Sequence, residues 1–156
     1  MVSSQEILAE LLRRKKLTLS AAESCTGGRV GDKITNVPGS SEYFLGSAVT
    51  YSNEAKMALL GVRKESLDAH GAVSEQVAKE MAAGCREAFG SDIAVSTTGI
   101  AGPSGGSKEK PVGLVWFAVS DGKRTAMESK LFSGDRERIK EAASAHAIDM
   151  VVKFVE

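Results

Sequence analysis

Residues 17–34, LTLSAAESCTGGRVGDKI, contain the pattern that decides the fold. The stretch over 17–22 is short and apolar, which predicts a buried strand. It leads into a turn with two adjacent glycines, Gly27 and Gly28, and then into a helical pattern that Pro38-Gly39 ends. A strand, a glycine-containing turn and a helix in this order indicate a fold in which helices and strands alternate.

The rest of the chain continues this alternation. Ser74, Asp135 and Asn53 are each expected to cap the start of a helix, and Asp121-Gly122 predicts a tight hairpin between two strands. The predicted helices cover 4–16, 53–60, 74–89 and 135 to the end of the chain, and the further strands cover 44–51, 93–98, 112–119 and 124–132. We therefore expect one domain over 1–156, an α/β fold of the three-layer α/β/α sandwich type, whose mixed, mostly parallel sheet contains one antiparallel strand.

The composition is that of a globular protein and excludes several functional classes. Of the 156 residues 42% are hydrophobic and 26% are charged, and 20 basic residues balance 20 acidic ones. A chain without a cationic excess is not expected to bind nucleic acid. No apolar run reaches the length of about 18 residues that a membrane-spanning helix needs, so no membrane partner is expected.

Cysteine and histidine are scarce and scattered. Cys25 and Cys85 lie far apart, and His70 and His146 share no spacing with them that is typical of a zinc site. We therefore expect reduced thiols, a cytoplasmic location, no metal and no cofactor. His70 is interpreted as a turn residue and His146 as a packing or surface residue.

The first glycine turn offers a nucleophile. Ser24 and Cys25 precede Thr26, Gly27 and Gly28 at a predicted helix start, where backbone N–H groups could stabilise an anion or an oxyanion. For an isolated pair of glycines, close packing of strand and helix explains the pattern at least as well. The turn is neither a P-loop nor a GxGxxG turn.

A hydroxyl nucleophile needs a base, and neither histidine has a context that points to this turn. Tyr51 ends the second predicted strand and Lys56 lies five residues later, so both could reach the crevice at the strand ends. To act as a base near neutral pH, Lys56 would need a pKa about 3 units below its usual value, which requires burial or a neighbouring cation. From spacing alone, a solvated helix residue Lys56 and a Tyr51 ring at the core edge explain the sequence better than a catalytic pair does.

A second turn follows the strand over 93–98. Thr98, Gly99 and Gly102 would let backbone approach a ligand there, although a mobile loop would look the same. Arg136, in the first turn of the last helix, has the forked geometry that suits a phosphate, or it is simply solvated.

Taken together, these segments resemble the C-terminal domain of the CinA (competence/damage-inducible) family over almost the whole chain. The segments that carry the resemblance are AESCTGG with Gly28, VPGSSEYFLGSAVTYSNEAK (37–56), LLGV (59–62), HGAVS (70–74), TGIAGPSGG (98–106), EKPVGLVWFAV (109–119) and FSGDRERI (132–139).

The resemblance implies a nicotinamide-nucleotide amidase, which hydrolyses the carboxamide of nicotinamide mononucleotide to nicotinate mononucleotide and ammonia. It implies Ser24 as nucleophile with Tyr51 and Lys56 as partners, and an acyl-enzyme whose oxyanion the 26–28 turn would stabilise. Residues expected to contact the substrate are Cys25, Thr26, Gly27, Gly28, Asn53, Thr98, Gly99, Gly102 and Arg136. It also implies the stand-alone form of the family, without the molybdopterin-binding-like domain of many members, and a possible homodimer.

Two other functional classes stay open at this point. The chain could be a nucleotide-binding regulatory module without turnover, or a competence- or DNA-damage-related interaction protein whose glycine turns are structural.

Overall fold

The computed structural model describes residues 2–156 and contains one five-stranded sheet with the strand order β2-β1-β3-β4-β5. Strand β1 pairs in parallel with β2 and β3, whereas β4 is antiparallel to both β3 and β5. One strand therefore runs against the other four, which confirms the expected mixed sheet. The strands are β1 (Leu19–Glu23), β2 (Phe44–Val49), β3 (Ile93–Gly99), β4 (Leu114–Ser120) and β5 (Thr125–Leu131).

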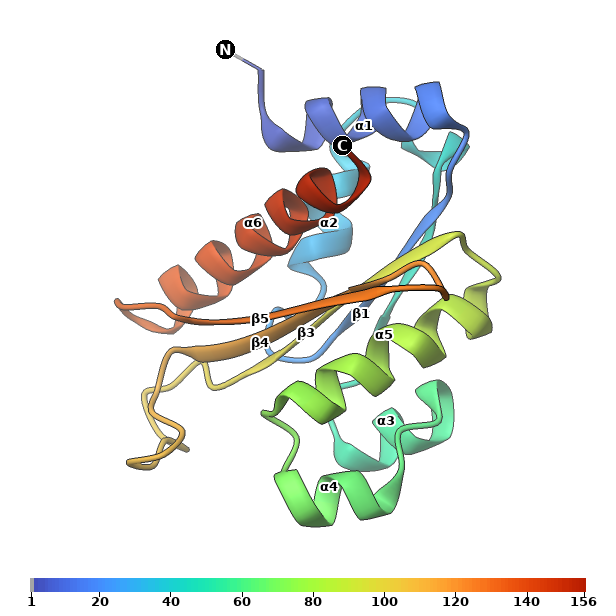
Figure 1. Ribbon diagram of the computed structural model, residues 1–156. Helices are drawn as coiled ribbons and strands as arrows, with labels where there is room; N and C mark the ends of the chain where they lie inside the picture. Colours follow the sequence, from blue (N-terminus) through green and yellow to red (C-terminus); the bar gives the residue numbers. More distant parts are fainter. Residues whose placement is uncertain (1) are drawn as a thin grey trace.

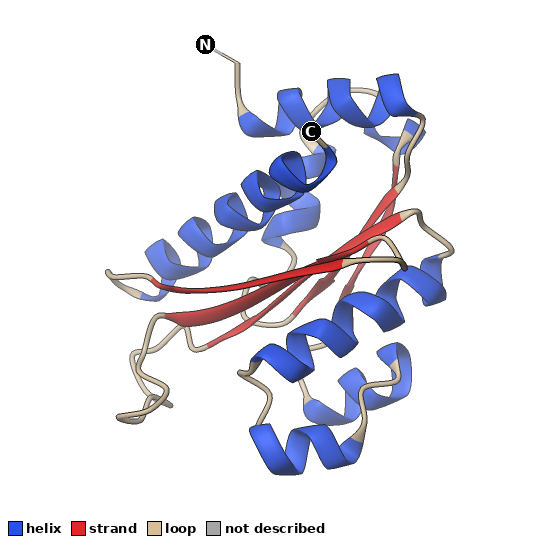
Figure 2. Cartoon of the chain, in the orientation of Figure 1, coloured by secondary structure: helices blue, strands red, loops and turns tan. Residues whose placement is uncertain are grey.

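Helices cover both faces of this sheet, so the molecule has three layers (Figures 1 and 2). On one face lie α1 (Ser4–Lys15), α2 (Arg29–Thr35) and α6 (Arg136–Val155), and on the other lie α3 (Asn53–Leu60), α4 (Lys64–His70) and α5 (Glu75–Phe89). A short 3-10 helix, η1 (Ser40–Glu42), precedes β2. Within residues 2–156, none of the helices combines the length and apolar character needed to span a bilayer.

The apolar core is split by the sheet, as strand β4 illustrates. Its alternate residues Val115, Phe117 and Val119 belong to the cluster under α1 and α6, while Ala118 packs with Ala78 and Ala82 of α5. Alternate side chains of β4 thus contribute to the apolar core on both faces of the sheet. All of these residues are fully or almost fully buried.

Several expected local features are confirmed. Ser74 Oγ accepts a hydrogen bond from the Val77 amide, and Asp135 caps α6 through the Arg138 amide. The chain reverses at Asp121-Gly122 between β4 and β5.

Three local expectations were wrong or incomplete. Ser52, not Asn53, caps α3: its side chain accepts a hydrogen bond from the Ala55 amide. The backbone of Ser52 is extended, as in an N-cap, whereas Asn53 is already the first helical residue. Strand β2 ends at Val49, so Tyr51 lies beyond it. Helix α4 has no counterpart among the predicted helices, and its N-cap is Arg63, a residue that supplies no capping oxygen.

The topology brings three chain segments to one end of the sheet. Glu23, the last residue of β1, pairs with Val49 of β2 and with Thr97 of β3. The residues that follow these strands therefore share one crevice.

Helix α3 is held over this crevice by a close contact with α5. A Cβ atom on Gly84 of α5 would lie 1.7 Å from the carbonyl oxygen of Leu60, the last residue of α3. Only glycine lets the two helices approach this closely.

Candidate active site

A pocket of about 400 Å³ and a smaller one of about 250 Å³ lie at opposite ends of the sheet. The smaller pocket occupies the crevice at the carboxyl ends of β1, β2 and β3 and contains most of the predicted site residues. It is lined by Ser24, Cys25, Tyr51, Asn53, Lys56, Ala72, Val73, Thr98, Gly99, Ala101 and Arg136.

Ser24 lies directly after β1 and its position is fixed by β3. Its amide donates to the carbonyl oxygen of Thr97 at 3.1 Å, which extends the β1–β3 pairing by one residue. The side chain is buried apart from 7% of its surface. Ser24 is thus held rigidly by the sheet while its hydroxyl faces the pocket.

Lys56 provides the closest partner of that hydroxyl. Its Nζ lies 3.0 Å from Ser24 Oγ, 2.8 Å from the carbonyl oxygen of Thr50 and 3.3 Å from that of Tyr51. The residue is only 1% exposed. Burial lowers the pKa of Lys56 below its usual value, although the charge of a Cys25 thiolate would oppose this shift.

These contacts suit both protonation states of the amine. A neutral lysine has two N–H donors and one lone pair, whereas the ammonium form has three donors. In the structure Nζ donates to Ser24 Oγ and to the carbonyl oxygens of Thr50 and Tyr51, as the ammonium form can. When the amine is neutral, the two carbonyl oxygens can accept both N–H groups, and the lone pair can accept the hydroxyl proton of Ser24. The pair therefore has the arrangement of a nucleophile and its general base.

Cys25 lines the same pocket but has the opposite character. Burial raises the pKa of its thiol to about 12, so the thiolate is scarce near neutral pH. Both cysteines are free and buried, as expected. The contact with Lys56 Nζ at 3.0 Å therefore favours the hydroxyl of Ser24 over the thiol of Cys25 as the nucleophile.

Arg136 and Tyr51 form the outer rim. Arg136 Nη1 donates to the carbonyl oxygen of Gly102 at 2.6 Å, and Nη2 donates to the Tyr51 hydroxyl at 3.0 Å. Tyr51 is 63% exposed, so its ring is not part of the core. Its carbonyl oxygen, rather than its hydroxyl, contacts Lys56. Gly102, which was expected to contact the substrate, does not line the pocket; its carbonyl oxygen binds Arg136 instead.

Thr98 and Gly99 form the floor on the β3 side. Thr98 Oγ1 donates to the carbonyl oxygen of Ala72 at 2.8 Å, which ties β3 to the segment before α5. A Cβ on Gly99 would lie 2.7 Å from the carbonyl oxygen of Leu114, so a side chain has no room there.

The sequence predicted that backbone amides at the start of α2 would bind an anion, but most of these amides already donate to acceptors within the protein. The Gly28 amide donates to the carboxylate of Glu23 at 3.1 Å, and the Gly27 amide donates to the carbonyl oxygen of Ser24 at 3.1 Å. Thr26 directs its hydroxyl to Glu23 as well. Thr26, Gly27 and Gly28 do not line the pocket, because an internal carboxylate already occupies the helix start.

Sequence reasoning missed Glu23. The signal was a carboxylate at the end of an apolar strand, directly before the nucleophile candidate and without a lysine or arginine nearby in the chain. Such a residue needs several internal hydrogen-bond donors when it is buried.

The histidines and the possible metal ligands are not gathered at this pocket. His70 ends α4, and His146 packs between the rings of Phe117 and Phe132, with centroid distances of 4.7 and 6.1 Å. Over residues 2–156, no three His, Cys, Asp or Glu side chains are grouped so that they could hold a metal ion.

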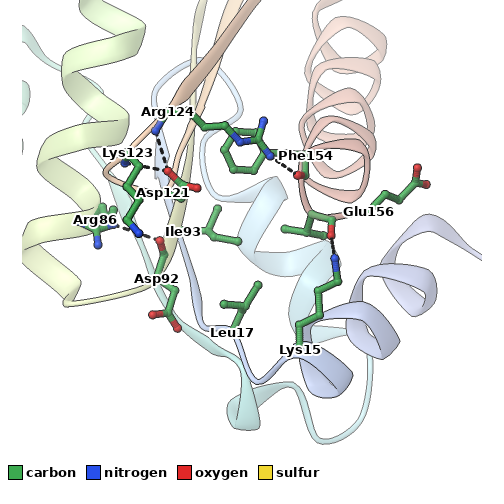
Figure 3. Close-up of a pocket in the computed structure, with 11 residues that line it drawn as sticks. Lys15, Leu17, Arg86, Asp92, Ile93, Asp121, Lys123, Arg124, Phe154 and Glu156 are labelled. Carbon is green, nitrogen blue, oxygen red and sulfur yellow. Dashed lines mark hydrogen bonds between the residues drawn. The ribbon is translucent and has the colours of Figure 1, made fainter.

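The larger pocket lies at the amino-terminal ends of β1 and β3 (Figure 3). Its cationic side chains are engaged by main-chain carbonyl groups. Lys15 donates to Val155, Arg86 donates to Asp92 at 3.1 Å, and Arg124 donates to Phe154 at 2.7 Å. Arg124 also stacks over the Phe154 ring, 3.7 Å from its centroid. Lys15 and Arg124 thus bind carbonyl groups at the end of α6, whereas Arg86 binds the segment between α5 and β3.

Comparison with known proteins gives the same answer as the motifs. The model of the CinA C-terminal domain matches residues 2–155. The chain belongs to the CinA C-terminal domain family.

Curated CinA relatives are similar over nearly all of this chain. A CinA-like protein of Chloroherpeton thalassium is 53% identical over 151 residues, which are 94% of this chain and 36% of the relative. A CinA-like protein of Kosmotoga olearia is 50% identical over 149 residues, 96% of this chain and 36% of the relative. The chain thus spans little more than a third of the length of these relatives.

Solved CinA structures share the fold. A competence or damage-inducible protein from Enterobacter asburiae is 34% identical with a TM-score of 0.94, and all of both chains is covered. The competence/damage inducible protein CihA from Agrobacterium tumefaciens is 38% identical with a TM-score of 0.89, and 96% of each chain is covered.

Proposed function

We propose that this CinA domain is a serine amidohydrolase that hydrolyses the carboxamide of nicotinamide mononucleotide. The observation that carries the proposal is the buried Lys56, whose Nζ lies 3.0 Å from the hydroxyl oxygen of Ser24. Burying a lysine is costly, and perturbed titratable groups in clefts are typical of active sites. A regulatory module that only binds a nucleotide would not need this pair.

The reaction would proceed through an acyl-enzyme. Neutral Lys56 accepts the proton of Ser24 as Oγ attacks the carboxamide carbon and a C–O bond forms. The tetrahedral intermediate then collapses, the C–N bond breaks, and Lys56 gives its proton to the leaving nitrogen, which departs as ammonia. Water then enters, Lys56 accepts a proton from it, and its oxygen attacks the acyl carbon. The C–O bond to Ser24 breaks to give the carboxylic acid, and Lys56 returns the proton to Ser24 Oγ, which restores the hydroxyl and the neutral amine.

The developing oxyanion would be held by backbone donors beside Ser24. Within residues 2–156, the amides of Cys25 and Thr26 donate to no backbone or side-chain acceptor, unlike those of Gly27 and Gly28. Two free amides next to a nucleophile are a suitable oxyanion site. Of the oxyanion donors expected at residues 26–28, this proposal keeps only the Thr26 amide and adds that of Cys25.

The substrate assignment rests on the CinA resemblance and on the shape of the site. A pocket of about 250 Å³ with Asn53 and Arg136 at its rim is suited to a small planar amide with a polar, anionic extension. Arg136 uses two N–H groups within the protein, and its guanidinium has others free for a phosphate.

The decisive experiment is an ammonia-release assay on the purified protein with nicotinamide mononucleotide, nicotinamide riboside and free nicotinamide. Release from the mononucleotide supports the amidase. Absence of release with a ligand-dependent rise in Tm would instead favour the regulatory module. Absence of both would favour an interaction protein.

A further inference from the structure

Glu23 is a buried carboxylate that lies beside the active site and that the reaction itself does not use. It is fully shielded from solvent. Oε1 accepts hydrogen bonds from Thr26 Oγ1 at 2.7 Å and from the amides of Gly28 at 3.1 Å and Val30 at 2.9 Å. Oε2 accepts from the Gly31 amide at 3.0 Å and from Ser47 Oγ at 2.6 Å.

A carboxylate is the side chain that fits this set of donors. Two carboxylate oxygens offer about four lone-pair positions, and five N–H or O–H groups converge on them. In the part of the chain that the structure describes, no lysine, arginine or histidine forms an ion pair with Glu23. Its charge is therefore balanced by backbone amides and hydroxyls alone.

One branch of this network leads to the nucleophile. Because the Thr26 hydroxyl donates to Glu23, the Thr97 hydroxyl is left to donate to Thr26 across 2.9 Å. Thr97 Oγ1 lies 3.4 Å from the amide nitrogen of Ser24, whose N–H also donates to the Thr97 carbonyl. The carboxylate is thus connected to the backbone of Ser24 through two threonines.

The other branch leads to the base. Ser47 belongs to β2, and β2 continues into Thr50, whose amide donates to the Glu23 carbonyl oxygen at 2.8 Å. The Thr50 carbonyl oxygen in turn accepts from Lys56 Nζ at 2.8 Å. Glu23 therefore lies between the segment that carries Ser24 and the segment that orients Lys56.

We propose that Glu23 is a positioning residue that holds Ser24 Oγ and Lys56 Nζ at reacting distance by joining the start of α2, strand β2 and the Thr26-Thr97 pair through its carboxylate. The inference rests on the proposed amidase. It assigns no contact with the substrate to Glu23, so its loss should lower the rate of the chemical step while substrate binding is retained.

The chain contains a matched control for a carboxylate that has a purely structural role. Glu80 on α5 accepts from the Arg63 amide at 2.8 Å, from Ser66 Oγ at 2.5 Å and from Gln76 Nε2 at 2.5 Å. It also joins two helix segments, but it does not line the pocket with Ser24. Glu80→Gln should lower stability without affecting the reaction.

The experiment compares Glu23→Gln, Ser47→Ala and Glu80→Gln with the unmodified protein, each assayed well below its own Tm. Two readouts are used: kcat and KM for ammonia release from nicotinamide mononucleotide, and the rate at which a fluorophosphonate probe labels Ser24, followed by mass spectrometry. Glu23→Gln should lower kcat and the labelling rate by about 100-fold, the scale expected for a misplacement near 1 Å, with KM within about two-fold. Ser47→Ala should lower both rates by roughly three- to ten-fold, because four of the five donors remain.

Several outcomes would overturn the inference. It fails if Glu23→Gln is folded and labelled at the wild-type rate, or if Glu80→Gln loses kcat to the same extent at an equal loss of Tm. If Glu23→Gln does not fold, an unchanged labelling rate in Ser47→Ala overturns it and a lowered rate supports it. The probe keeps this test separate from the substrate, because labelling of Ser24 without ammonia release contradicts only the proposed amidase.

Discussion

The two ends of the sheet contain pockets of opposite character. The larger, about 400 Å³, lies at the amino-terminal ends of β1 and β3, and its cations are exposed or bonded to carbonyl groups that end α6. The smaller, about 250 Å³, lies at the carboxyl ends and encloses a lysine that is 1% exposed and hydrogen-bonded to a serine. Volume alone would not select the pocket that we propose as the active site.

The difference lies in what each cation does. At the larger pocket, Lys15 and Arg124 neutralise the negative end of a helix, which stabilises the fold. At the smaller pocket, Lys56 forms no ion pair with a carboxylate among residues 2–156, and burial lowers its pKa. A buried lysine beside a hydroxyl group is a better indicator of catalysis than a large pocket is.

The largest expected effect is the loss of the nucleophile. Ser24→Ala should lower kcat for ammonia release by about 10⁴-fold or more while the Tm and the ligand-induced Tm shift are retained. Cys25→Ala should keep most of the activity, because its thiol has a pKa of about 12. An inactive Cys25→Ala together with an active Ser24→Ala would reverse the assignment of the nucleophile.

The second effect concerns the base. Lys56→Arg keeps the charge but cannot release a proton near neutral pH, so kcat should fall by about 10²- to 10⁴-fold, the usual contribution of general acid–base catalysis. In the unmodified protein, kcat/KM should fall as the pH drops below the lowered pKa of Lys56. A Lys56→Arg variant with normal turnover would show that the residue supplies only positive charge.

The third effect tests the rim of the smaller pocket. Arg136→Ala should lower kcat/KM for the mononucleotide roughly ten- to a hundred-fold, mainly through KM, because a charge-assisted hydrogen bond to phosphate contributes about 1.5–3 kcal/mol. Hydrolysis of the riboside should be almost unchanged. Tyr51→Phe serves as the control, since it removes the hydroxyl that Arg136 Nη2 contacts at 3.0 Å. Equal losses for both substrates would mean that Arg136 acts through Tyr51 instead.

A fourth effect is seen in stability and its dependence on pH. Because the pKa of Lys56 is lowered in the folded protein, the unfolded chain binds more protons between that pKa and the usual value, so stability increases as the pH rises through this interval. Lys56→Met lacks this dependence. The free energy of unfolding of the unmodified protein, measured by urea denaturation, should therefore rise relative to that of Lys56→Met as the pH increases toward the usual lysine pKa of 10.5. A constant difference would mean that burial does not perturb Lys56.

The smallest effect is expected at the larger pocket. Arg124→Ala should destabilise the protein by about 1 kcal/mol, through loss of the stacking on Phe154 and of one hydrogen bond, and leave kcat/KM unchanged. Urea denaturation and the ammonia assay measure the two quantities. A marked loss of activity would show that the two ends of the sheet are coupled.

The fold could be predicted from the sequence wherever local chemistry decides. The caps at Ser74 and Asp135 and the reversal at Asp121-Gly122 are signals within a few residues, and all three are confirmed. Helix α4 was missed because it is only seven residues long and its N-cap, Arg63, supplies no capping side chain. Ser52 and Asn53 are both good capping residues, so the sequence could not decide between them.

The site was predictable in its members but not in its contacts. Ser24 and Lys56 were identified as candidates from residue type and from the CinA resemblance, yet their 3.0 Å contact depends on how α3 packs against α5. The role of the Gly27-Gly28 turn was misjudged for the same reason. Its free amides are a property of an isolated helix start, and the carboxylate that satisfies the Gly28 amide is positioned by the end of β1.

The contact between Gly84 and Leu60 has a consequence for how the protein tolerates genetic change. Helix α3 carries Lys56 and packs against α5 at Gly84, where the methyl group of an alanine would overlap the carbonyl oxygen of Leu60. Gly84→Ala would push the base away from the nucleophile without altering any residue that a substrate touches. In a saturation-mutagenesis screen for growth, position 84 should therefore be classed with the active-site residues, although its distance from the pocket would suggest a neutral position.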